Sequence, residues 1–230
     1  MRLRKKPWIA AAILEYSDIV IFSEEGAHVG HWRELFGHQR PVHVELGTGK
    51  GDFLVGMAKR WPQINFIGIE YEEEVLYYAA RKVCEQQLTN IRLLPFDSKH
   101  ITDIFAPGEI QQLYINFCDP WPKRRHAKRR LTHPEFLDRY RLVLAGGGGL
   151  FFKTDNERLF EYSLNQFAAS DLALANISLD LHHYGNYVDN VMTEYEQKFS
   201  ALGMKIYRCE AYFSRDASWI EQNRSTVLML

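Results

Sequence analysis

Short apolar runs alternate with amphipathic segments from residue 41 onward. Five of these runs have the length and the β-favouring residues of buried strands. They are residues 42–46, 65–70, 91–97, 113–117 and 150–155. The segments between and after them carry apolar side chains three and four positions apart, which predicts helices. The predicted helices are residues 53–61, 72–87, 134–144 and 157–168.

The two ends of the chain are less regular. Residues 177–183 and 205–213 are predicted to be strands that flank a helix from Glu194 to about Leu202. The four glycines at 146–149 are expected to end the helix that Pro134 begins. Residues 1–40 show no strong periodicity, and only a short helix around 31–36 is expected there.

Strands that alternate with helices of this length indicate βαβ units. The predicted fold class is α/β, with a Rossmann-like, mostly parallel sheet and helices on both of its faces. There are no internal repeats or low-complexity linkers, so one domain is expected. Residues 1–40 would be a basic N-terminal arm and lead-in, 41–213 the domain, and 214–230 a C-terminal tail without an assigned role. The tail could dock on the core or on a second subunit.

Composition narrows the class of protein. The chain has 230 residues, of which 46% are hydrophobic and 25% charged, as in ordinary soluble domains. It has no apolar run of membrane-spanning length, and its basic start leads into too short an apolar stretch for a signal peptide, so a cytoplasmic protein is expected. Cys84, Cys118 and Cys209 have neither disulfide-framework nor zinc-ligand spacing. His28 and His31 also lack partners that would complete a metal site, so none is predicted.

Positive charge is concentrated in two places, although the net charge is −1. One is residues 2–6, and the other is residues 123–130, where six of eight residues are Lys or Arg. A nucleic acid needs only such a local patch. Each run could equally be a solvated surface, and residues 2–6 a disordered end.

Acidic residues fall at the ends of the predicted strands. They are Glu45, Glu70, Asp97, Asp119 and Asp155. Ligands of open α/β sheets bind at the carboxyl ends of the strands. Because neighbouring carboxylates repel each other, a row of them predicts a ligand with several hydroxyl and amino donors.

A glycine-rich turn, Gly47-Thr-Gly-Lys-Gly51, follows the first strand. It does not match the phosphate loop, because Gly51 follows the lysine, and Asp52 replaces the third glycine of the dinucleotide pattern. S-adenosylmethionine fits better because it offers hydroxyl, amino and ammonium donors and no phosphate. Glu45, Gly47 and Gly49 could bind its methionine end, Glu70 the ribose and Asp97 the adenine, an order that resembles the Rossmann-like methyltransferases.

Two prolines bracket Trp121 directly after Asp119. Because a residue before proline is pushed from the helical region, Asp119 and Trp121 are expected to be extended. Trp121 could stack on a nucleic-acid base or could simply stiffen this loop.

The sequence resembles the bacterial tRNA (guanine-N7-)-methyltransferases from about residue 4 to residue 213. The matching motifs are Arg4-Lys-Lys-Pro-Trp8, Glu45-Leu-Gly-Thr-Gly-Lys-Gly51, Asp119-Pro-Trp-Pro-Lys-Arg-Arg-His126, Lys128-Arg-Arg-Leu131, Lys153-Thr-Asp155 and Thr193-Glu-Tyr-Glu196. The resemblance implies methyl transfer from S-adenosylmethionine to N7 of the guanine at position 46, in the tRNA variable loop.

The resemblance also implies roles for single residues. Asp119 would be catalytic and, with Glu45, Gly47, Gly49, Glu70 and Asp97, would bind the cofactor. The substrate contacts would be Lys123, Asp155, Thr193, Glu194, Tyr195 and Glu196. The RNA contacts would be Arg125, His126, Lys128, Arg129 and Arg130.

The chemistry of the reaction agrees with these roles. Guanine N7 carries an in-plane lone pair, so the site must orient the base and needs no general base or cysteine nucleophile. Asp119 is therefore expected to orient cofactor and base, and Asp119 or Asp155 to favour the positive charge that develops on the purine. Thr193 and Glu196 also have the spacing of a helix capping box, so both could serve the helix, a ligand, or both.

Other functions remain open at this point. The alternatives are a methyltransferase of another RNA guanine and a non-catalytic RNA-binding protein on the same fold. The expected partner is tRNA, no membrane partner is expected, and the oligomeric state would be a monomer or a homodimer.

Overall fold

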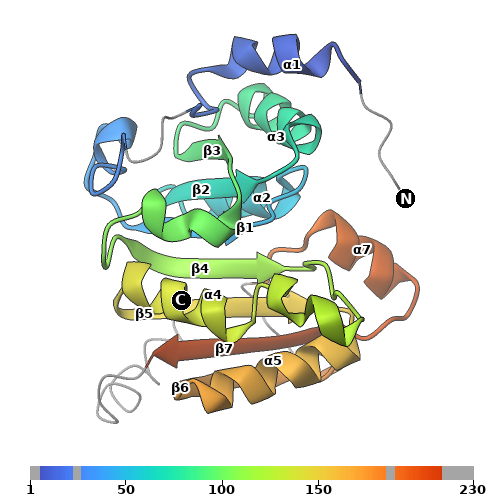
Figure 1. The fold of residues 1–230 in the computed structure, drawn as a ribbon. Helices are drawn as coiled ribbons and strands as arrows, with labels where there is room; N and C mark the ends of the chain where they lie inside the picture. Colours follow the sequence, from blue (N-terminus) through green and yellow to red (C-terminus); the bar gives the residue numbers. More distant parts are fainter. Residues whose placement is uncertain (1–5, 23–26, 185–189, 214–230) are drawn as a thin grey trace. The chain divides into compact units, whose positions relative to one another are not determined.

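The computed structural model describes residues 6–22, 27–184 and 190–213 (Figure 1). Residues 2–5 of the basic arm and the tail 214–230 lie outside these ranges. The chain divides into two compact units, Met1–Ala106 and Pro107–Leu230. Each unit is an α/β structure with its own strands and helices.

The first unit is built on three parallel strands. They are β1 (Val42–Leu46), β2 (Asn65–Glu70) and β3 (Ile91–Pro95), in the order β3-β2-β1. Helix α2 (Asp52–Arg60) connects β1 to β2, and α3 (Glu73–Glu85) connects β2 to β3. The expected strands 42–46 and 65–70 are confirmed to the residue, and the third ends two residues earlier than predicted because its last two residues turn into η3 (Ser98–Asp103).

Residues before β1 hold three short helices. The turn η2 (Glu34–Phe36) lies within the short helix expected around 31–36, whereas α1 (Ile9–Ala12) and η1 (Ile13–Tyr16) were not indicated by the sequence pattern. Ile9 and Ile13 are each 1% exposed, and the Trp8 ring packs edge-on to Tyr77 of α3 at 5.3 Å. Single turns are too short to give a helical period, which is why α1 and η1 were missed.

The described residues of the second unit form four strands in the order β4-β5-β7-β6. They are β4 (Ile110–Asn116), β5 (Leu144–Thr154), β6 (Leu172–Ser178) and β7 (Tyr207–Phe213). β4 and β5 are parallel, while β7 runs antiparallel to β5 and β6. Its helices are η4 (Arg124–Arg129), α4 (Pro134–Val143), α5 (Glu157–Ala169), α6 (Leu181–Tyr184) and α7 (Glu194–Ala201). Figure 1 shows α4 and α5 on one face of these strands.

Two expectations in this unit are wrong. The strand predicted at 177–183 lies at 172–178 instead, and the last three residues of the predicted range belong to α6. The Leu172-Ala-Leu-Ala stretch favours strands only weakly, and it becomes one through its antiparallel pairing with β7, in which Leu172 lies opposite Phe213.

The glycines at 146–149 do not end α4, since the helix ends at Val143 and all four glycines lie within β5. The β4–β5 register jumps from Ile110↔Leu144 to Gln112↔Gly149, so this stretch is a bulge. A Cβ atom at Gly148 would lie 2.8 Å from the Gln111 carbonyl oxygen, and one at Gly149 would lie 2.5 Å from the Tyr212 ring. Gly148 and Gly149 are therefore needed for close approach within the sheet.

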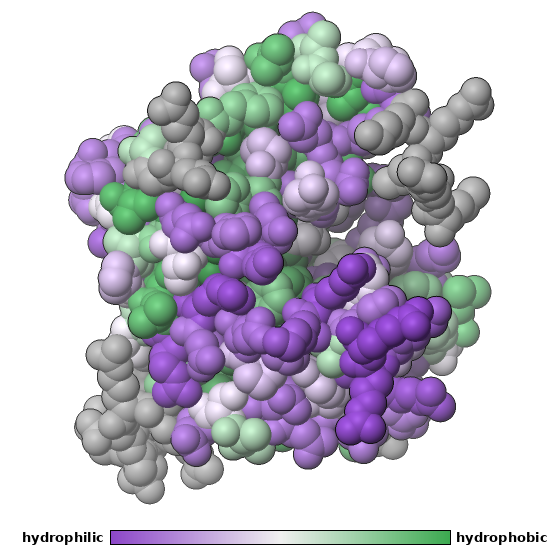
Figure 2. Space-filling model, in the orientation of Figure 1, coloured by the Kyte–Doolittle hydropathy of each residue, from purple (hydrophilic) through white to green (hydrophobic). Residues whose placement is uncertain are grey.

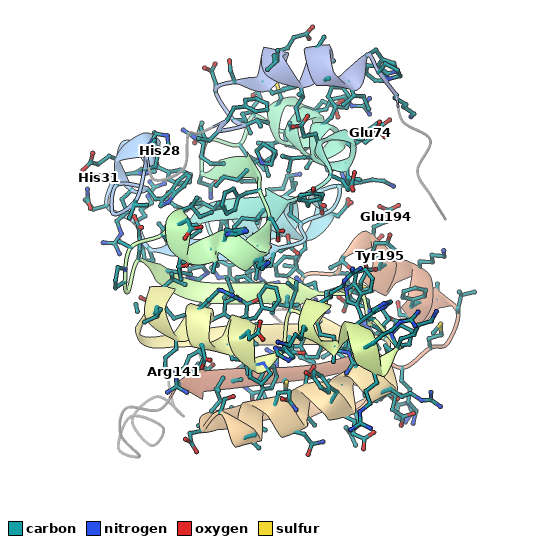
Figure 3. All side chains as sticks on the ribbon, in the orientation of Figure 1. His28, His31, Glu74, Arg141, Glu194 and Tyr195 are labelled. Carbon is teal, nitrogen blue, oxygen red and sulfur yellow. The ribbon has the colours of Figure 1, made fainter. Side chains whose placement is uncertain are left out.

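No helix among the described residues is long and apolar enough to cross a membrane. The described residues also contain no group of three or more His, Cys, Asp or Glu side chains that could hold a metal ion. His28 and His31 lie on the same short segment of the first unit (Figure 3).

Candidate functional site

The glycine-rich turn of the first unit follows β1 and lies beside the carboxyl end of β2. Gly47, Gly49 and Gly51 have φ angles of 70°, 57° and 78°, a region that disfavours other residues. The backbone N–H of Gly47 donates to the Ile69 carbonyl at 2.8 Å, so β2 holds the turn. A Cβ atom at Gly47 or Gly49 would meet nothing within 4 Å, so the turn presents backbone to open space.

Glu70, the last residue of β2, reinforces this turn. Its carboxylate accepts hydrogen bonds from the backbone N–H groups of Gly49 and Glu72, both at 3.1 Å. Burial raises the pKa of Glu70, and these hydrogen bonds counteract the rise. Because the half-buried Glu70 carboxylate is already oriented, it is well suited to accept hydrogen bonds from hydroxyl groups of a ligand.

Glu45 and Asp97 lie at the same end of this sheet. Glu45 is 2% exposed and accepts a hydrogen bond from the Thr48 hydroxyl at 2.6 Å. Asp97 is exposed, lies two residues beyond β3, and accepts a hydrogen bond from the Lys99 N–H at 2.9 Å. The Phe96 N–H donates to the Glu70 carbonyl at 3.1 Å, which places the residue before Asp97 against the end of β2.

The first unit therefore brings together all of its predicted cofactor residues: Glu45, Gly47, Gly49, Glu70 and Asp97. Asp52, which argued against a dinucleotide, is paired with Lys82 of α3 at 2.7 Å. The residues present are oxygen acceptors and open backbone, and they fit a ligand rich in hydroxyl and amino donors.

In the second unit, Asp119 and Asp155 follow the parallel strands β4 and β5. Asp119 is exposed, three residues after β4, and Asp155 is half-buried, directly after β5. The Phe117 N–H donates to the Lys153 carbonyl at 2.9 Å, which keeps the two strand ends together. Both carboxylates therefore lie at one end of the second unit's sheet.

Trp121, in the loop after Asp119, is not extended as expected, since its φ is 42°. Phe117, two residues before Asp119, also has a positive φ, of 51°. Positive φ is costly for bulky side chains and persists where surrounding contacts enforce it. The rule for residues before proline was thus overridden at Trp121 by contacts from a residue nine positions later.

That residue is Arg130. Its guanidinium donates to the Pro120 carbonyl at 3.1 Å and to the Trp121 carbonyl at 3.0 Å. It also lies 4.2 Å from the centre of the Tyr162 ring of α5. Arg130 is half-buried, so its charge is committed largely to holding the Pro120–Trp121 backbone.

The other basic residues of this segment face solvent. Those exposed are Lys123, Arg124, Arg125, Lys128 and Arg129. Arg129 lies 4.8 Å from the Trp121 ring centre, and Lys128 pairs with Glu135 at 2.7 Å. His126, half-buried, meets the Trp121 ring edge-on at 5.8 Å. Figure 2 shows strongly hydrophilic side chains gathered on this side of the second unit.

Trp121 is half-buried between these groups, with Arg129 over its ring and His126 at its edge. The Trp121 ring therefore packs within its own loop. These contacts favour a role of Trp121 in stiffening the loop over direct stacking on a base.

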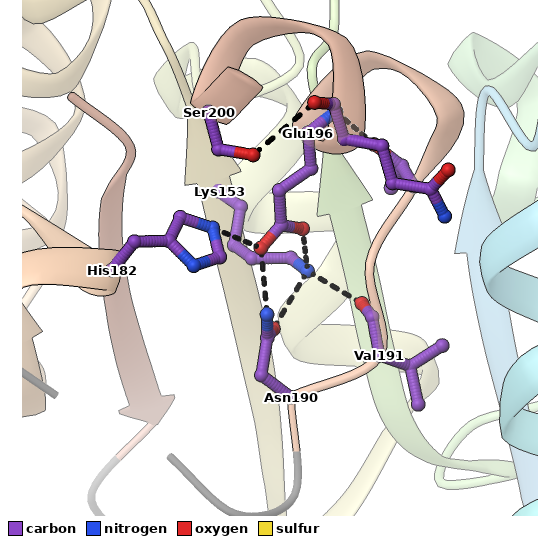
Figure 4. Close-up of polar contacts among 8 residues, drawn as sticks. Lys153, His182, Asn190, Val191, Glu196 and Ser200 are labelled. Atoms are coloured by element: carbon purple, nitrogen blue, oxygen red, sulfur yellow. Dashed lines mark hydrogen bonds and ion pairs between the residues drawn. The ribbon is translucent and has the colours of Figure 1, made fainter. Parts of the chain in front are cut away.

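A buried ion pair anchors the segment before α7 to β5 (Figure 4). Lys153 Nζ lies 2.6 Å from the Glu196 carboxylate, and the two side chains are 7% and 0% exposed. Lys153 also donates to the Val191 carbonyl at 2.9 Å and to the Asn190 side-chain oxygen at 3.0 Å. The other Glu196 oxygen accepts from the Asn190 amide at 2.6 Å and lies 3.0 Å from His182 Nε2.

Thr193 caps α7. Its hydroxyl accepts a hydrogen bond from the Glu196 N–H at 2.9 Å, and the residue is 8% exposed. The helix-cap interpretation is thus confirmed for Thr193, while the Glu196 carboxylate turns to Lys153 and not back to the cap. Glu194 and Tyr195 are exposed instead, and Figure 3 shows both at the start of α7.

The contact of Lys153 with Glu196 was not predicted, although Lys153 belongs to one of the family motifs. The available signal was its place in Leu150-Phe-Phe-Lys-Thr154, because a lysine inside an apolar strand needs a buried anion. His182 carried no comparable signal, since its contact depends on how α6 and α7 meet.

Cys118 lies beside Asp119 without the properties of a nucleophile. Burial, together with the Asp119 charge, raises the pKa of the Cys118 thiol to about 12. The thiol is therefore protonated at neutral pH. This agrees with a reaction that does not use a cysteine nucleophile.

A family model described as "Putative methyltransferase" matches residues 39–209. The chain is 52% identical over 213 residues to a tRNA (guanine-N(7)-)-methyltransferase of Halalkalibacterium halodurans, covering 93% of this chain and 96% of the relative. It is 50% identical over 210 residues to a protein of the same name from Bacillus subtilis, covering 91% and 98%.

Solved structures agree on the fold. A 16S rRNA methyltransferase, KamB, aligns with a TM-score of 0.62 at 12% identity, covering 84% of this chain and 97% of that one. An antibiotic-related methyltransferase aligns with a TM-score of 0.59 at 17% identity, covering 79% and 92%. The predicted Rossmann-like class I methyltransferase fold is thereby confirmed. The chain matches the two relatives along nearly its whole length, and it therefore belongs to the tRNA (guanine-N(7)-)-methyltransferase family.

Proposed function

We propose that this protein transfers a methyl group from S-adenosylmethionine to N7 of the guanine at position 46 in the variable loop of tRNA. The observation that carries the proposal is the roughly one-half identity to relatives of that name along more than nine-tenths of the chain. The local geometry supports it, since each unit presents acids at the carboxyl end of its strands. A substrate of this kind also implies a cytoplasmic location.

The first unit would hold the cofactor. Glu70 would accept the ribose hydroxyls, because its carboxylate is fixed by two backbone N–H groups and lies beside the glycine turn. Glu45, Gly47 and Gly49 would bind the methionine end, and Asp97 the adenine. S-adenosylmethionine, when bound, supplies a methyl group on a positively charged sulfur.

The second unit would supply the groups that orient the base. In the transfer, the N7 lone pair forms the new C–N bond while the methyl–sulfur bond breaks, and the positive charge passes to the purine. No proton moves, so Asp119 would orient cofactor and base, and Asp155 would contact the guanine and favour the charge that develops on it. Lys123, Glu194 and Tyr195 would complete the substrate contacts.

Thr193 and Glu196 would act on the substrate in a different way from Glu194 and Tyr195. Both are buried, and their polar atoms are engaged with the α7 backbone and with Lys153. We therefore assign them the task of placing the exposed start of α7. Arg125, His126, Lys128 and Arg129 would bind the tRNA backbone, and Arg130 would hold the loop from which they project.

The role of Asp119 can be tested in single turnovers at saturating tRNA and cofactor. An orienting carboxylate predicts that Asp119→Asn slows transfer, while the wild-type rate is the same in H2O and D2O because no proton moves in the methyl-transfer step. A solvent isotope effect in the wild type that disappears in Asp119→Asn would assign Asp119 to proton removal instead.

The alternative of a non-catalytic RNA-binding protein makes a separate prediction. Such a protein has no need of Glu45, Glu70 and Asp97, whose carboxylates accept hydrogen bonds near the strand ends of the first unit. Saturating S-adenosylmethionine should raise the melting temperature, because it binds only the folded state. An unchanged melting temperature would favour the RNA-binding alternative.

A further inference from the structure

Three aromatic rings of the second unit gather beside the start of α7. Phe117, directly after β4, lies 6.5 Å from Tyr195 between ring centres, with 22° between the ring planes. Phe199, one turn further along α7, lies 6.2 Å from Phe117 and 6.0 Å from Tyr195. We refer to Phe117, Tyr195 and Phe199 as the aromatic platform.

Lys153 fixes both sides of this platform. Its carbonyl accepts the Phe117 N–H at 2.9 Å, and its ammonium binds Glu196, the residue next to Tyr195, at 2.6 Å. The Phe117 backbone is held at a φ of 51°, which is uncommon for an aromatic residue. Strain of this kind is retained where a structure needs a particular orientation.

The platform is open on the side of Tyr195. Tyr195 is 56% exposed, whereas Phe117 and Phe199 are half-buried behind it. Lys198 Nζ lies 5.8 Å from the Phe199 ring centre, so a cation already approaches that ring. Tyr195 thus offers much of its ring to solvent, and the Phe117 and Phe199 rings support it from behind.

We propose that the target guanine, turned out of the RNA stack, stacks on Tyr195 of the aromatic platform, and that Phe117 and Phe199 hold this ring in place. The inference rests on the proposed function. A flat base of an RNA loop stacks well on aromatic side chains. The platform therefore adds a stacking surface to the polar contacts expected from Asp155 and Glu194.

The reaction gives this surface a second task. Transfer of the methyl group to N7 leaves the purine positively charged, and the face of an aromatic ring attracts a cation. Stacking on Tyr195 should therefore become stronger as the methyl group is transferred. A surface of this kind stabilises the transition state and should also bind the methylated product better than the substrate.

The experiment uses the full chain with tRNA transcripts. Tyr195→Leu removes the ring from an exposed position and is expected to lower kcat/KM by about 5- to 150-fold, the range for loss of one stacked base. Tyr195→Phe keeps the ring and is expected to restore most of the activity. Leu202→Ala, an exposed apolar residue just beyond α7, serves as the control and should match the wild type. Melting curves of all variants check that they are folded.

A second readout tests the charge preference. Guanosine and 7-methylguanosine are compared as inhibitors of tRNA methylation below neutral pH, with S-adenosylhomocysteine present. The wild type should prefer 7-methylguanosine by about 2- to 30-fold, and Tyr195→Leu should lose this preference. Equal inhibition by the two nucleosides, or no inhibition, overturns the proposal.

The failures of the two proposals are distinguishable. If the wild type does not methylate guanine N7 in tRNA, the proposed function fails. If it does so and Tyr195→Leu keeps the wild-type kcat/KM, the aromatic platform alone is refuted.

Discussion

Replacing Glu196 with Gln tests a fully buried carboxylate of the second unit. The change keeps the shape of the side chain and removes a carboxylate that is 0% exposed. Lys153, with 7% of its side chain exposed, would keep its charge and lose the anion 2.6 Å away. Breaking one partner of a buried ion pair costs about 3–5 kcal/mol, because the remaining charge stays desolvated.

The expected effect on melting is correspondingly large. In a chain of this size, 1 kcal/mol shifts the melting temperature by about 2–4 °C. Glu196→Gln should therefore lower it by about 6–20 °C. Glu194→Gln, on the exposed side of the same helical turn, is the matched control and should change the free energy of unfolding by no more than about 0.5 kcal/mol.

A double variant separates the ion pair from general damage to α7. Lys153→Met in the Glu196→Gln background removes the unpaired ammonium, so the double variant should melt above Glu196→Gln alone. Calorimetry or circular dichroism at one fixed pH measures all four proteins. A Glu196→Gln variant within about 2 °C of the wild type, or a double variant less stable than the single one, would refute this reasoning.

The remaining predictions concern pH and salt. Because burial raises the pKa of Glu70, S-adenosylmethionine should bind more weakly as pH falls through a value above the ordinary 4.5, and Glu70→Gln should remove this inflection in a calorimetric titration. The raised pKa of Glu70 also affects folding of the free protein. Its contribution to the free energy of unfolding is present at low pH and is lost as the pH rises through the raised pKa. Burial lowers the pKa of His43 to about 3, so the free energy of unfolding should fall by about 1.4 kcal/mol per unit as pH drops from about 6.5 towards 3, and a His43→Phe variant should lack this slope. Arg129→Ala should reduce the slope of log affinity for tRNA against log salt by about 0.7–0.9, whereas Arg130→Ala should slow methyl transfer with less change in that slope; equal slopes for both variants would contradict the division of roles.

The local pattern of apolar and turn residues was sufficient to predict the strands β1 and β2. The run 42–46 and the run 65–70 are short, apolar and bounded by turn residues, and both became strands at those positions. Because parallel strands share one carboxyl end, the acids that follow them could be grouped from sequence alone. Glu45, Glu70 and Asp97 were predicted in this way.

Pattern failed where distant residues decide the conformation. Gly149 looked like part of a helix stop, but its need for glycine comes from Tyr212 on another strand. Trp121 was expected to be extended, but Arg130 holds its backbone at positive φ. Neither contact leaves a periodic trace in the chain, so neither could be inferred before the fold was known.

The motif Thr193-Glu-Tyr-Glu196 groups residues whose surroundings differ in the structure. Thr193 and Glu196 were grouped with Tyr195 as substrate contacts, yet the first two are buried and Tyr195 is exposed. Spacing along a helix shows which residues share a face, but not which face is buried. The Lys153–Glu196 ion pair shows that Glu196 lies on the buried face of α7, whereas Tyr195 lies on the exposed face.

The central claim is tested most directly by methyl transfer to bulk tRNA. Purified protein is incubated with S-adenosylmethionine and tRNA that lacks the modification, and the position of N7-methylguanine is mapped by cleavage at the modified base. Our account predicts methylation at guanine 46 of the variable loop, and its loss when that guanine is replaced by adenine. N7-methylguanine at another position, or no methyl transfer to tRNA, would contradict it.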